Sequence, residues 1–312
     1  MVPAAQSFSP FYLTAGAVQL RAARFEGDGS RLCLILNGQT EFIEKYFEVI
    51  DEFRGRGFAV VTFDWRGQGG SDRLLPDRRK AHIEDFSAYD QDLNTVIREV
   101  LKPMMAEGNT IKPIAVAHSM GGNVLLRRLH DVRGEFAAAI LSAPMVGITP
   151  RGVPWWLVER IADRLNQNGP SPDFVWGMGK RDQLKLPFAL QIVTSDARRY
   201  ARNQALLAAD PELRLNGPTW GWLGAALHSI ALLEKPGYAE AIRTRALVIG
   251  AGRDRVCNTG AIRAFAARMP HGEYVEIDGA QHELLMERDP LRAKWWAAVD
   301  TFLTQNAPAV SR

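Results

Sequence analysis

The sequence is poor in cysteine. Cys33 and Cys257 are the only two among 312 residues, and they lie far apart in the chain. Two cysteines cannot build a disulfide framework, so this usage favours a reducing compartment such as the cytoplasm. The N-terminal region also lacks a basic segment followed by an apolar core, so we expect no secretory signal peptide.

Long apolar runs and a strong net charge are absent too. No stretch reaches the roughly 18 consecutive apolar residues typical of a membrane-spanning helix. The formal net charge is only +3, which is too small and too dispersed to indicate a nucleic-acid partner. It allows a mild attraction to anionic lipid surfaces. With 46% hydrophobic and 23% charged residues, the composition is that of a globular protein with a full core.

Signatures of cofactors and metals are also missing. Residues 250–252 (Gly-Ala-Gly) follow an apolar run but lack the third glycine of a dinucleotide fingerprint. Residues 67–70 (Gly-Gln-Gly-Gly) are not followed by the Gly-Lys-Ser/Thr of a phosphate-binding loop. No group of histidine, cysteine and acidic residues has the spacing of metal ligands. We therefore expect neither a cofactor nor a metal.

The chain does contain a serine between small residues at a predicted strand–helix junction. Residues 117–122 are Ala-His-Ser-Met-Gly-Gly, so Ser119 follows the apolar run 113–116 and precedes a helical pattern at 123–130. This arrangement is typical of a nucleophile elbow, a sharp turn that lifts a hydroxyl above the sheet and leaves room only for small neighbours. Taken alone, Ser119 could equally be an ordinary helix N-cap.

A nucleophile elbow predicts an acid and then a histidine further along the chain. Asp254 follows the apolar run 246–249, and His282 follows the strand-like run 274–277. A serine hydroxyl is a weak nucleophile until a base takes its proton, and the imidazole needs a carboxylate to orient it. The order Ser119, Asp254, His282 therefore predicts a catalytic triad.

Alternatives remain for two members of this triad. Asp278 is a rival acid four residues before His282, but we prefer Asp254 because it lies on a separate loop that can approach the imidazole from behind. His282 could be an ordinary loop histidine. The other five histidines fit less well, because one lies inside the elbow, three precede the predicted acid, and His271 precedes a strand.

An early loop is expected to complete an oxyanion hole. The apolar run 32–36 predicts a strand, and Gly38 and Gln39 lie in the loop that follows it. In this arrangement one donor is the amide after the nucleophile, here Met120, and the other is an amide of the early loop, for which we choose Gln39. Gly38 lets the backbone come close to a substrate. Without the elbow, the same loop would indicate only a turn at a strand end.

Several segments of the chain resemble one enzyme family, the monoacylglycerol lipase and lysophospholipase branch of the α/β-hydrolases. Five segments follow the family pattern: the His-Gly-x-x-Glu oxyanion loop (37–41), the Asp-x-x-Gly-x-Gly-x-Ser turn (63–71), the Gly-His-Ser-Met-Gly-Gly elbow (117–122), the Asp-Arg-x-Cys acid loop (254–257) and the histidine loop (279–283). Asn37 replaces the usual histidine and Ala117 the usual glycine, but every triad group is present.

The order of the predicted elements indicates an α/β fold. Strand-like and helical patterns alternate up to about Pro144, which predicts a mostly parallel sheet flanked by helices. Between residues 146 and 237 this alternation stops, and the segment is rich in tryptophan, proline and glycine. The resemblance implies a cap at this point of an α/β-hydrolase fold. We therefore predict a core domain of residues 1–145 and 238–312 and a mainly helical cap of residues 146–237.

The predicted pocket combines cap and core residues. The segment around Trp155 and Trp156 has apolar residues at helical spacing, and Trp220 follows later in the cap. These residues suit an acyl-chain pocket that also touches a lipid surface, and they equally suit a contact that holds the cap on the core. Both interpretations remain open. The core contributes four further candidates: Gly38, Phe42, His118 and Leu284.

The resemblance implies a serine hydrolase that cleaves carboxylic esters through an acyl-enzyme, with lysophospholipids or monoacylglycerols as substrates. One alternative is a relative of prolyl aminopeptidases, which would need an acid in the cap to bind an amino terminus; Asp173, Asp182 and Glu234 are available. Another is a non-catalytic ligand-binding protein of the same fold. We expect a cytoplasmic protein without a nucleic-acid partner, whose cap allows transient peripheral contact with a membrane.

Overall fold

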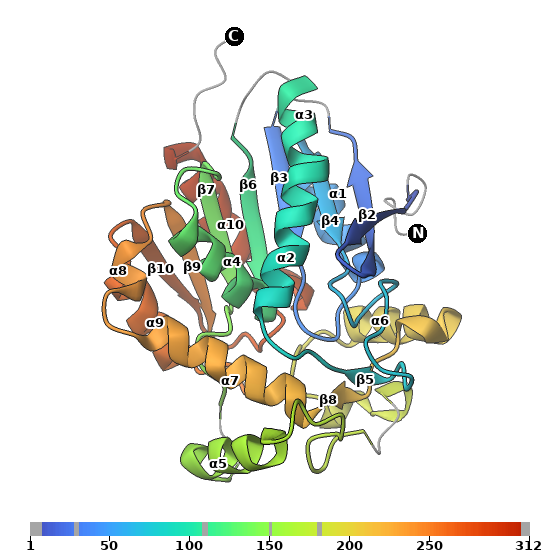
Figure 1. The fold of residues 1–312 in the computed structure, drawn as a ribbon. Helices are drawn as coiled ribbons and strands as arrows, with labels where there is room; N and C mark the ends of the chain where they lie inside the picture. Colours follow the sequence, from blue (N-terminus) through green and yellow to red (C-terminus); the bar gives the residue numbers. More distant parts are fainter. Residues whose placement is uncertain (1–7, 28–30, 108–111, 150–151, 180–182, 307–312) are drawn as a thin grey trace.

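An eight-stranded sheet forms the centre of the protein (Figure 1). The structure is a computed structural model, and it describes residues 8–27, 31–107, 112–149, 152–179 and 183–306. β1 and β2 form an antiparallel edge, and the other six strands run parallel to one another. In spatial order the strands are β1 (Phe11–Ala15), β2 (Val18–Phe25), β4 (Phe58–Phe63), β3 (Arg31–Leu36), β6 (Ile114–His118), β7 (Ala138–Ser142), β9 (Ala246–Ala251) and β10 (Gly272–Ile277).

The sheet separates two hydrophobic layers. Leu34 and Leu36 of β3 face the layer that contains α2, α4, α8 and α9, whereas Cys33 and Ile35 face the layer that contains α1 and α10. This alternation follows from the two-residue period of a strand, and helices on both faces explain why the central strands are almost wholly apolar. The helices of these layers are α1 (Phe47–Arg54), α2 (Ser87–Val96), α4 (Met120–Asp131), α8 (Tyr238–Ala241), α9 (Thr259–Arg268) and α10 (Asp289–Asn306).

In the layer that contains α2 and α4, one long helix continues through a π-helical turn, which is wider than an α-helical turn. α2 passes through a π-helical turn (Ile97–Leu101) into α3 (Lys102–Glu107). Val96, Ile97 and Leu101 keep facing the main hydrophobic layer through this turn.

The chain between β7 and β9 contributes, in its described part, no strand to the main sheet. It contains α5 (Trp155–Asn166), α6 (Ala197–Ala209) and α7 (Trp220–Glu234), which lie across one end of the sheet (Figure 1). A short strand, β8 (Gly217–Pro218), pairs instead with β5 (Lys80–Ala81). Because β3, β6, β9 and β10 run parallel and their carboxyl ends lie at this end of the sheet, the loops that follow them meet between the sheet and the helices (Figure 1).

Helix α7 joins this helical segment to the sheet layers. Most of its residues are apolar and buried, whereas His228 and Glu234 are exposed. Trp222, Ala226 and Ile230 belong to the same hydrophobic cluster as β6 and α4. The helix begins at Thr219, whose hydroxyl accepts the amide of Trp222 at 3.1 Å. We keep the division into a core (1–145 and 238–312) and a cap (146–237) as a proposal, with α7 as the element that connects the two.

Candidate active site

The turn after β6 holds Ser119 in a strained backbone conformation. Ser119 has φ 51° and ψ −116°, and such a conformation costs a non-glycine residue about 1–3 kcal/mol. Two backbone hydrogen bonds support the turn: the Ser119 amide donates to Ser142 O (3.1 Å), and the Ser119 carbonyl accepts from the Met145 amide (2.9 Å). Ser119 precedes α4, but its side chain makes no capping hydrogen bond. The hydroxyl therefore does not serve as an ordinary N-cap.

Small residues surround Ser119 because other backbone segments lie close to the turn. A Cβ atom on Gly121 would lie 2.5 Å from Asn37 O, and one on Gly122 would lie 2.8 Å from Pro144 Cβ. Ala117 is fully buried, and its methyl group belongs to the main hydrophobic cluster. Alanine in place of the usual glycine is therefore accommodated at this position.

A continuous hydrogen-bonded chain joins Ser119, His282 and Asp254. His282 Nε2 lies 2.9 Å from Ser119 Oγ, and His282 Nδ1 lies 2.7 Å from Asp254 Oδ2. A carboxylate can only accept, so Nδ1 carries the proton and Nε2 is left to accept from the hydroxyl. The imidazole and the carboxylate are almost completely shielded from solvent. The three side chains predicted from the sequence are thus brought together in the order that nucleophilic catalysis needs.

The carboxylate of Asp254 is held by its own loop. Its second oxygen accepts the amides of Val256 (2.7 Å) and Cys257 (2.8 Å). Burial alone would raise the pKa of Asp254, but His282 and these amides favour the charged form, and the net effect lowers the pKa below its ordinary value. Asp278 is exposed just beyond β10. The rival acid is therefore not the one behind the imidazole.

A buried carboxylate organises the loop after β3. Glu41 Oε2 accepts the Gly38 amide (2.5 Å) and the Tyr46 hydroxyl (2.6 Å), and Lys45 Nζ lies 2.8 Å from the other oxygen. Burial alone would raise the pKa of Glu41, but the Lys45 charge together with the hydrogen bonds from Lys45 and Tyr46 favours the carboxylate, and the pKa falls to about 2. Lys45 also bridges to Glu283 (2.7 Å), so one ammonium ties this loop to the residue that follows His282.

Gln68 supports the same loop from the opposite side. Its Nε2 donates to Gly38 O (2.8 Å), and its Oε1 accepts the Thr40 amide (3.3 Å). A Cβ atom on Gly38 would lie 3.1 Å from His118 Cδ2 and 3.2 Å from Ser119 Cβ. Glycine at position 38 thus permits the close approach of the loop to the nucleophile, as the sequence predicts.

The two amides predicted as oxyanion donors are free to donate. Among the hydrogen bonds of the described residues, none has the Gln39 or the Met120 amide as its donor. Met120 is the first residue of α4, and amides in the first turn of a helix have no partner within it. Unpaired donors beside a nucleophile suit a developing oxyanion, so we retain both assignments as proposals.

His118 packs directly against the histidine of the triad. The two ring centroids are 4.7 Å apart, and His118 Nδ1 lies 3.0 Å from Ser142 O, which can only accept. Burial lowers the pKa of His118 below its ordinary value, so the ring is neutral at pH 7. A neutral ring avoids a second positive charge next to His282 when that imidazole is protonated.

A cavity of about 360 Å³ opens beside this site. Thr40, Lys45 and Glu283 form its wall on the sheet side. The opposite wall comes from the segment between β7 and β9 and carries both apolar and polar side chains, among them Leu186, Leu190, Ile192, Tyr200, Asn203 and Gln204. The cavity therefore has a polar side next to the histidine loop and apolar surface further away.

Three residues predicted to line the pocket are buried packing residues. Phe42 packs with Leu207 and Leu213 beneath α6, and Leu284 belongs to the hydrophobic layer of α10. Trp220 packs edge-on against Trp176 with 5.2 Å between the ring centroids. None of the three lines the 360 Å³ cavity, and neither do Gly38 and His118.

The structure describes the side chain of only one of the two adjacent tryptophans of α5. Trp156 is 60% exposed, so it does not pack the cap onto the core. The side chain of Trp155 lies outside the described residues. Both predicted interpretations of Trp155 therefore remain untested.

Sequence reasoning did not assign roles to the residues that support the two loops. Glu41, Lys45, Gln68 and Glu283 are spread over three segments, and their partners become evident only in the folded structure. A weak signal exists, because Glu41 and Lys45 have the i,i+4 spacing of an ion pair and Glu283 directly follows His282.

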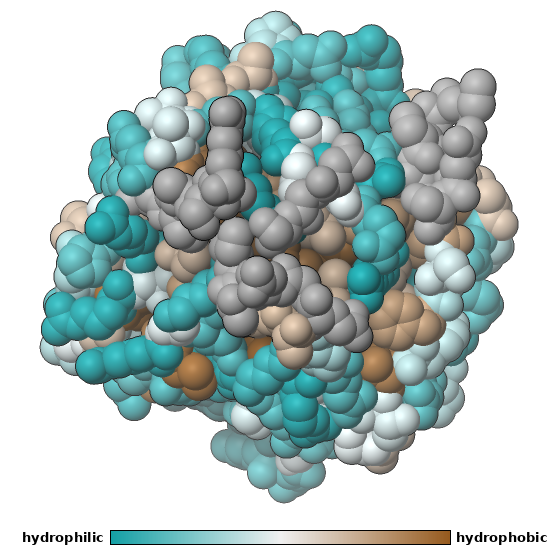
Figure 2. Space-filling view, turned by 90° about the horizontal axis from the view of Figure 1, so that it is seen from above, coloured by the Kyte–Doolittle hydropathy of each residue, from teal (hydrophilic) through white to brown (hydrophobic). Residues whose placement is uncertain are grey.

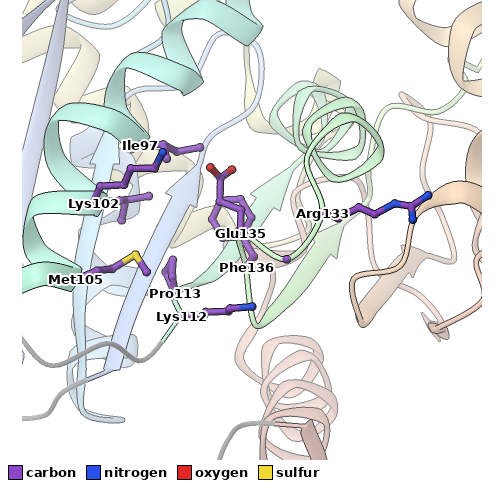
Figure 3. Close-up of a pocket in the computed structure, with 10 residues that line it drawn as sticks. Ile97, Lys102, Met105, Lys112, Pro113, Arg133, Glu135 and Phe136 are labelled. Carbon is purple, nitrogen blue, oxygen red and sulfur yellow. The ribbon is translucent and has the colours of Figure 1, made fainter.

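A second, smaller cavity of about 230 Å³ lies at the other end of the sheet, where β6 begins. Ile97, Met105 and Phe136 contribute apolar walls, and Lys102 lies at its edge (Figure 3). Glu135 is already paired with Arg128 at 2.7 Å. This cavity is separated from Ser119 by the length of β6, so it is not part of the site.

Comparison with known proteins identifies the family. The family model described as serine aminopeptidase, S33 (Hydrolase_4), matches residues 28–289. The chain belongs to this family.

Within the described residues, no helix combines the length and the apolar character needed to traverse a bilayer, and no group of three or more His, Cys, Asp or Glu side chains could hold a metal.

Similar proteins of this hydrolase family carry lipase names. Lysophospholipase L2 of Escherichia coli K12 is 33% identical over 306 residues, which cover 95% of this chain and 87% of that protein. The probable lysophospholipase L2 of Haemophilus influenzae is 27% identical over 278 residues, covering 88% and 83%. A soluble variant of monoglyceride lipase from Saccharomyces cerevisiae has a similar structure, with a TM-score of 0.78 at 19% identity, covering 97% and 98%. The predicted α/β-hydrolase fold and the predicted branch are confirmed.

Proposed function

We propose that this protein is a serine hydrolase that cleaves the carboxylic ester of lipids with a single acyl chain, either lysophospholipids or monoacylglycerols. The observation that carries the proposal is the unbroken hydrogen-bonded chain from the Ser119 hydroxyl through His282 to Asp254. The names of two similar proteins support an ester as the substrate: lysophospholipase L2, and a monoacylglycerol lipase of Mycolicibacterium smegmatis that is 27% identical over 127 residues, which cover 39% of this chain.

The first half of the reaction forms an acyl-enzyme. His282 Nε2 takes the proton of Ser119 while Oγ attacks the ester carbonyl, and Asp254 stabilises the imidazolium that results. The amides of Gln39 and Met120 donate to the oxyanion, and each such donor typically contributes about 100- to 1,000-fold in rate. His282 then protonates the leaving alcohol, and the acyl group stays on Ser119.

The second half of the reaction releases the fatty acid. His282 takes a proton from a water molecule, which attacks the acyl carbonyl, and the same two amides hold the second oxyanion. Collapse of this intermediate returns the proton from His282 to Ser119 Oγ. The shielding of the imidazole and carboxylate from solvent strengthens their interaction through both steps.

The cavity wall favours an ester over a peptide with a free amino terminus. An aminopeptidase needs an unpaired acid to bind the substrate ammonium. Glu283 is the only acid among the residues that line the 360 Å³ cavity, and Lys45 neutralises it at 2.7 Å. Asp173 and Glu234 are exposed at the surface, and Asp182 lies outside the described residues. The aminopeptidase alternative therefore lacks support from the described part of the cap.

A substrate panel tests this proposal. We expect kcat/KM for monoacylglycerols and lysophospholipids to rise about fourfold for each methylene that the pocket buries, because a buried methylene contributes about 0.8 kcal/mol. Initial rates across acyl chains of increasing length, below their micellar concentrations, measure this slope, and proline β-naphthylamide is the control substrate. A flat chain-length dependence together with turnover of the amide would contradict the proposal.

We further propose that the cap contacts lipid surfaces transiently, while the protein itself is cytoplasmic. Of the eight large hydrophobic side chains that are exposed in the described part of the chain, seven lie between residues 153 and 190. Trp156 is among the most exposed, at 60%. The opposite end of the molecule is mostly hydrophilic where its residues are coloured (Figure 2). Such an uneven distribution of apolar surface suits contact with a lipid interface at the cap.

Substitution of Trp156 measures this contact. We expect Trp156→Ser to weaken partitioning onto anionic phospholipid vesicles about 10- to 100-fold, because burying an aromatic side chain contributes about 2 kcal/mol. Tyr12→Ser is the matched control, since Tyr12 is 59% exposed but lies on β1, away from the cap. Vesicle co-sedimentation provides the measurement. Equal losses for the two variants, or none for either, would argue against contact through the cap.

A further inference from the structure

One buried carboxylate joins the loop of His282 to the cap. Glu287 is completely buried five residues after His282. Its Oε1 accepts the amides of Gln281 (2.8 Å) and Ser195 (3.1 Å). Its Oε2 accepts the amide of Arg288 (3.0 Å) and the hydroxyl of Ser195. Both oxygens are thus used by donors, and these donors come from two distant parts of the chain.

The donors to Glu287 come from the histidine loop and its continuation on one side and from the proposed cap on the other. Gln281 directly precedes His282, so its amide is one peptide unit from the catalytic base. Ser195 lies in the proposed cap, just before α6 and two residues after Val193, which lines the 360 Å³ cavity together with Ile192. Hydrogen bonds from amides to a carboxylate are stronger than those between neutral groups. Glu287 therefore links the backbone of the histidine loop to the wall of the cavity.

Further contacts connect the same two segments. The Glu283 amide donates to Val193 O (2.7 Å), and the Thr194 hydroxyl donates to Met286 O (2.7 Å). Residues 193–195 therefore lie alongside residues 283–287, with Glu287 at the end of the contact. Any displacement of one segment changes the hydrogen bonds of the other.

Helix α6 anchors the cap side of this contact. Asp196 caps the helix by accepting the amides of Arg198 and Arg199. The Arg199 guanidinium donates to Glu287 O (2.9 Å) and forms an ion pair with Glu48 on α1. The segment before α6 is thus a fixed support, and Glu287 transmits its position to the histidine loop.

We propose that Glu287 is a positioning residue, which holds His282 in line with Ser119 and makes that alignment depend on Ser195 of the cap. The proposal rests on the proposed function in so far as His282 is the catalytic base. It does not depend on the identity of the lipid substrate. Glu287 contacts neither Ser119 nor Asp254 in the described structure, so its effect on the reaction passes through the backbone of Gln281.

Glu287→Gln is the principal test. Glutamine has the same shape but places an NH₂ group where one carboxylate oxygen was, so in either orientation one amide of the histidine side, Gln281 or Arg288, and one donor of Ser195 lose their shared acceptor. We expect kcat on a short soluble ester, and the rate of labelling of Ser119 by a fluorophosphonate, to fall together about 10- to 100-fold, with KM nearly unchanged, because small misplacements of a catalytic group have effects of this size. Thermal unfolding measures any accompanying loss of stability.

Variants of Ser195 separate positioning from simple destabilisation. Ser195→Ala removes only the hydroxyl donor on the cap side, and we expect a smaller fall in the labelling rate. Ser195→Thr keeps the hydroxyl and should retain the wild-type rate. In the double variant Glu287→Gln/Ser195→Ala, the two losses in labelling rate should not add, because both changes break the link between Glu287 and Ser195. Glu240→Gln is the control, since Glu240 forms an exposed ion pair with Arg268 and lies outside the site.

The rate of fluorophosphonate labelling tests the positioning role of Glu287, whereas hydrolysis of lipid esters tests the proposed substrate. If wild-type protein reacts with the fluorophosphonate but Glu287→Gln reacts equally fast, the positioning role is wrong while the hydrolase assignment stands. Additive losses in the double variant would also overturn the proposed link to the cap. If wild-type protein is labelled but hydrolyses no lipid ester, the substrate assignment fails, and the labelling rates of the variants still test the role of Glu287. Should Glu287→Gln not fold, the labelling rates of Ser195→Ala and Ser195→Thr decide whether the positioning role holds, and equal rates in these two variants would overturn it.

Discussion

Ser119→Ala should reduce ester hydrolysis about 10⁵- to 10⁶-fold, because loss of the nucleophile disables the whole triad. Ser119 Oγ is the only atom of the triad that forms a covalent bond in the proposed reaction, and its partner His282 has no other hydroxyl at 2.9 Å among the described residues. Alanine tolerates the same backbone angles as serine, so the elbow and the melting temperature should be preserved. Steady-state kinetics on a short ester and mass spectrometry after fluorophosphonate treatment measure the two consequences.

The control for this experiment is Ser87→Ala. Ser87 is exposed at the start of α2, and its substitution should leave both activity and labelling unchanged. Wild-type protein should carry a single adduct on Ser119. If wild-type protein carries no adduct, the result would favour the non-catalytic, ligand-binding alternative; if Ser119→Ala retains turnover, another nucleophile must exist.

Asp254→Asn should lower kcat about 10⁴-fold with little change in KM, because an amide cannot hold the imidazole in the required tautomer. The carboxylate accepts from Nδ1 at 2.7 Å, and this leaves Nε2 unprotonated toward Ser119. An asparagine NH₂ group facing Nδ1 would favour the tautomer with the proton on Nε2, which cannot accept the serine proton. The loss should therefore appear in the chemical step and not in substrate binding.

Asp278→Asn provides the matched control for Asp254→Asn. Both residues follow strands of the same sheet edge, but Asp278 is exposed. Its substitution should change kcat by no more than about twofold, as is usual for surface positions. Comparable losses in the two variants would mean that the acid behind His282 has been assigned wrongly.

The stability contribution of Asp254 has a defined dependence on pH. Its pKa is lower in the folded protein than in the unfolded chain. The stabilisation is therefore complete above the unfolded pKa, near 3.9, and is lost as the pH falls through the folded pKa. Asp254 thus remains a carboxylate in the folded protein throughout the range in which the enzyme is expected to work.

Much of the site could be predicted because its reactive residues lie in short sequence motifs. Ser119 lies in a turn whose geometry depends on its immediate neighbours, Gly121 and Gly122. The choice of Asp254 over Asp278 followed from the position of each residue after a strand, and the structure agrees with it. Gly38 was assigned from the close approach that only glycine permits, and its neighbours in the structure are as close as expected.

The lining of the 360 Å³ cavity was not predicted from the sequence, because it depends on packing between distant segments. Phe42 and Leu284 are apolar residues close to triad or oxyanion residues in sequence, but the side chains of both turn into hydrophobic clusters. The wall of the 360 Å³ cavity includes Tyr200, Asn203 and other residues of the segment before and within α6. No periodicity in the sequence indicates which side of that segment lines the cavity.

The sequence alone determined the fold class and the order in which Ser119, Asp254 and His282 occur, and it predicted the oxyanion loop, because strands, turns and elbows depend on residues that are neighbours in the chain. Only the tertiary structure revealed how these loops are held. The Lys45 bridge between Glu41 and Glu283, and the link from Glu287 to Ser195, join residues that are far apart in sequence. Such buried polar partners are chosen by the folded geometry, since a charge without a partner in the core is too costly to keep.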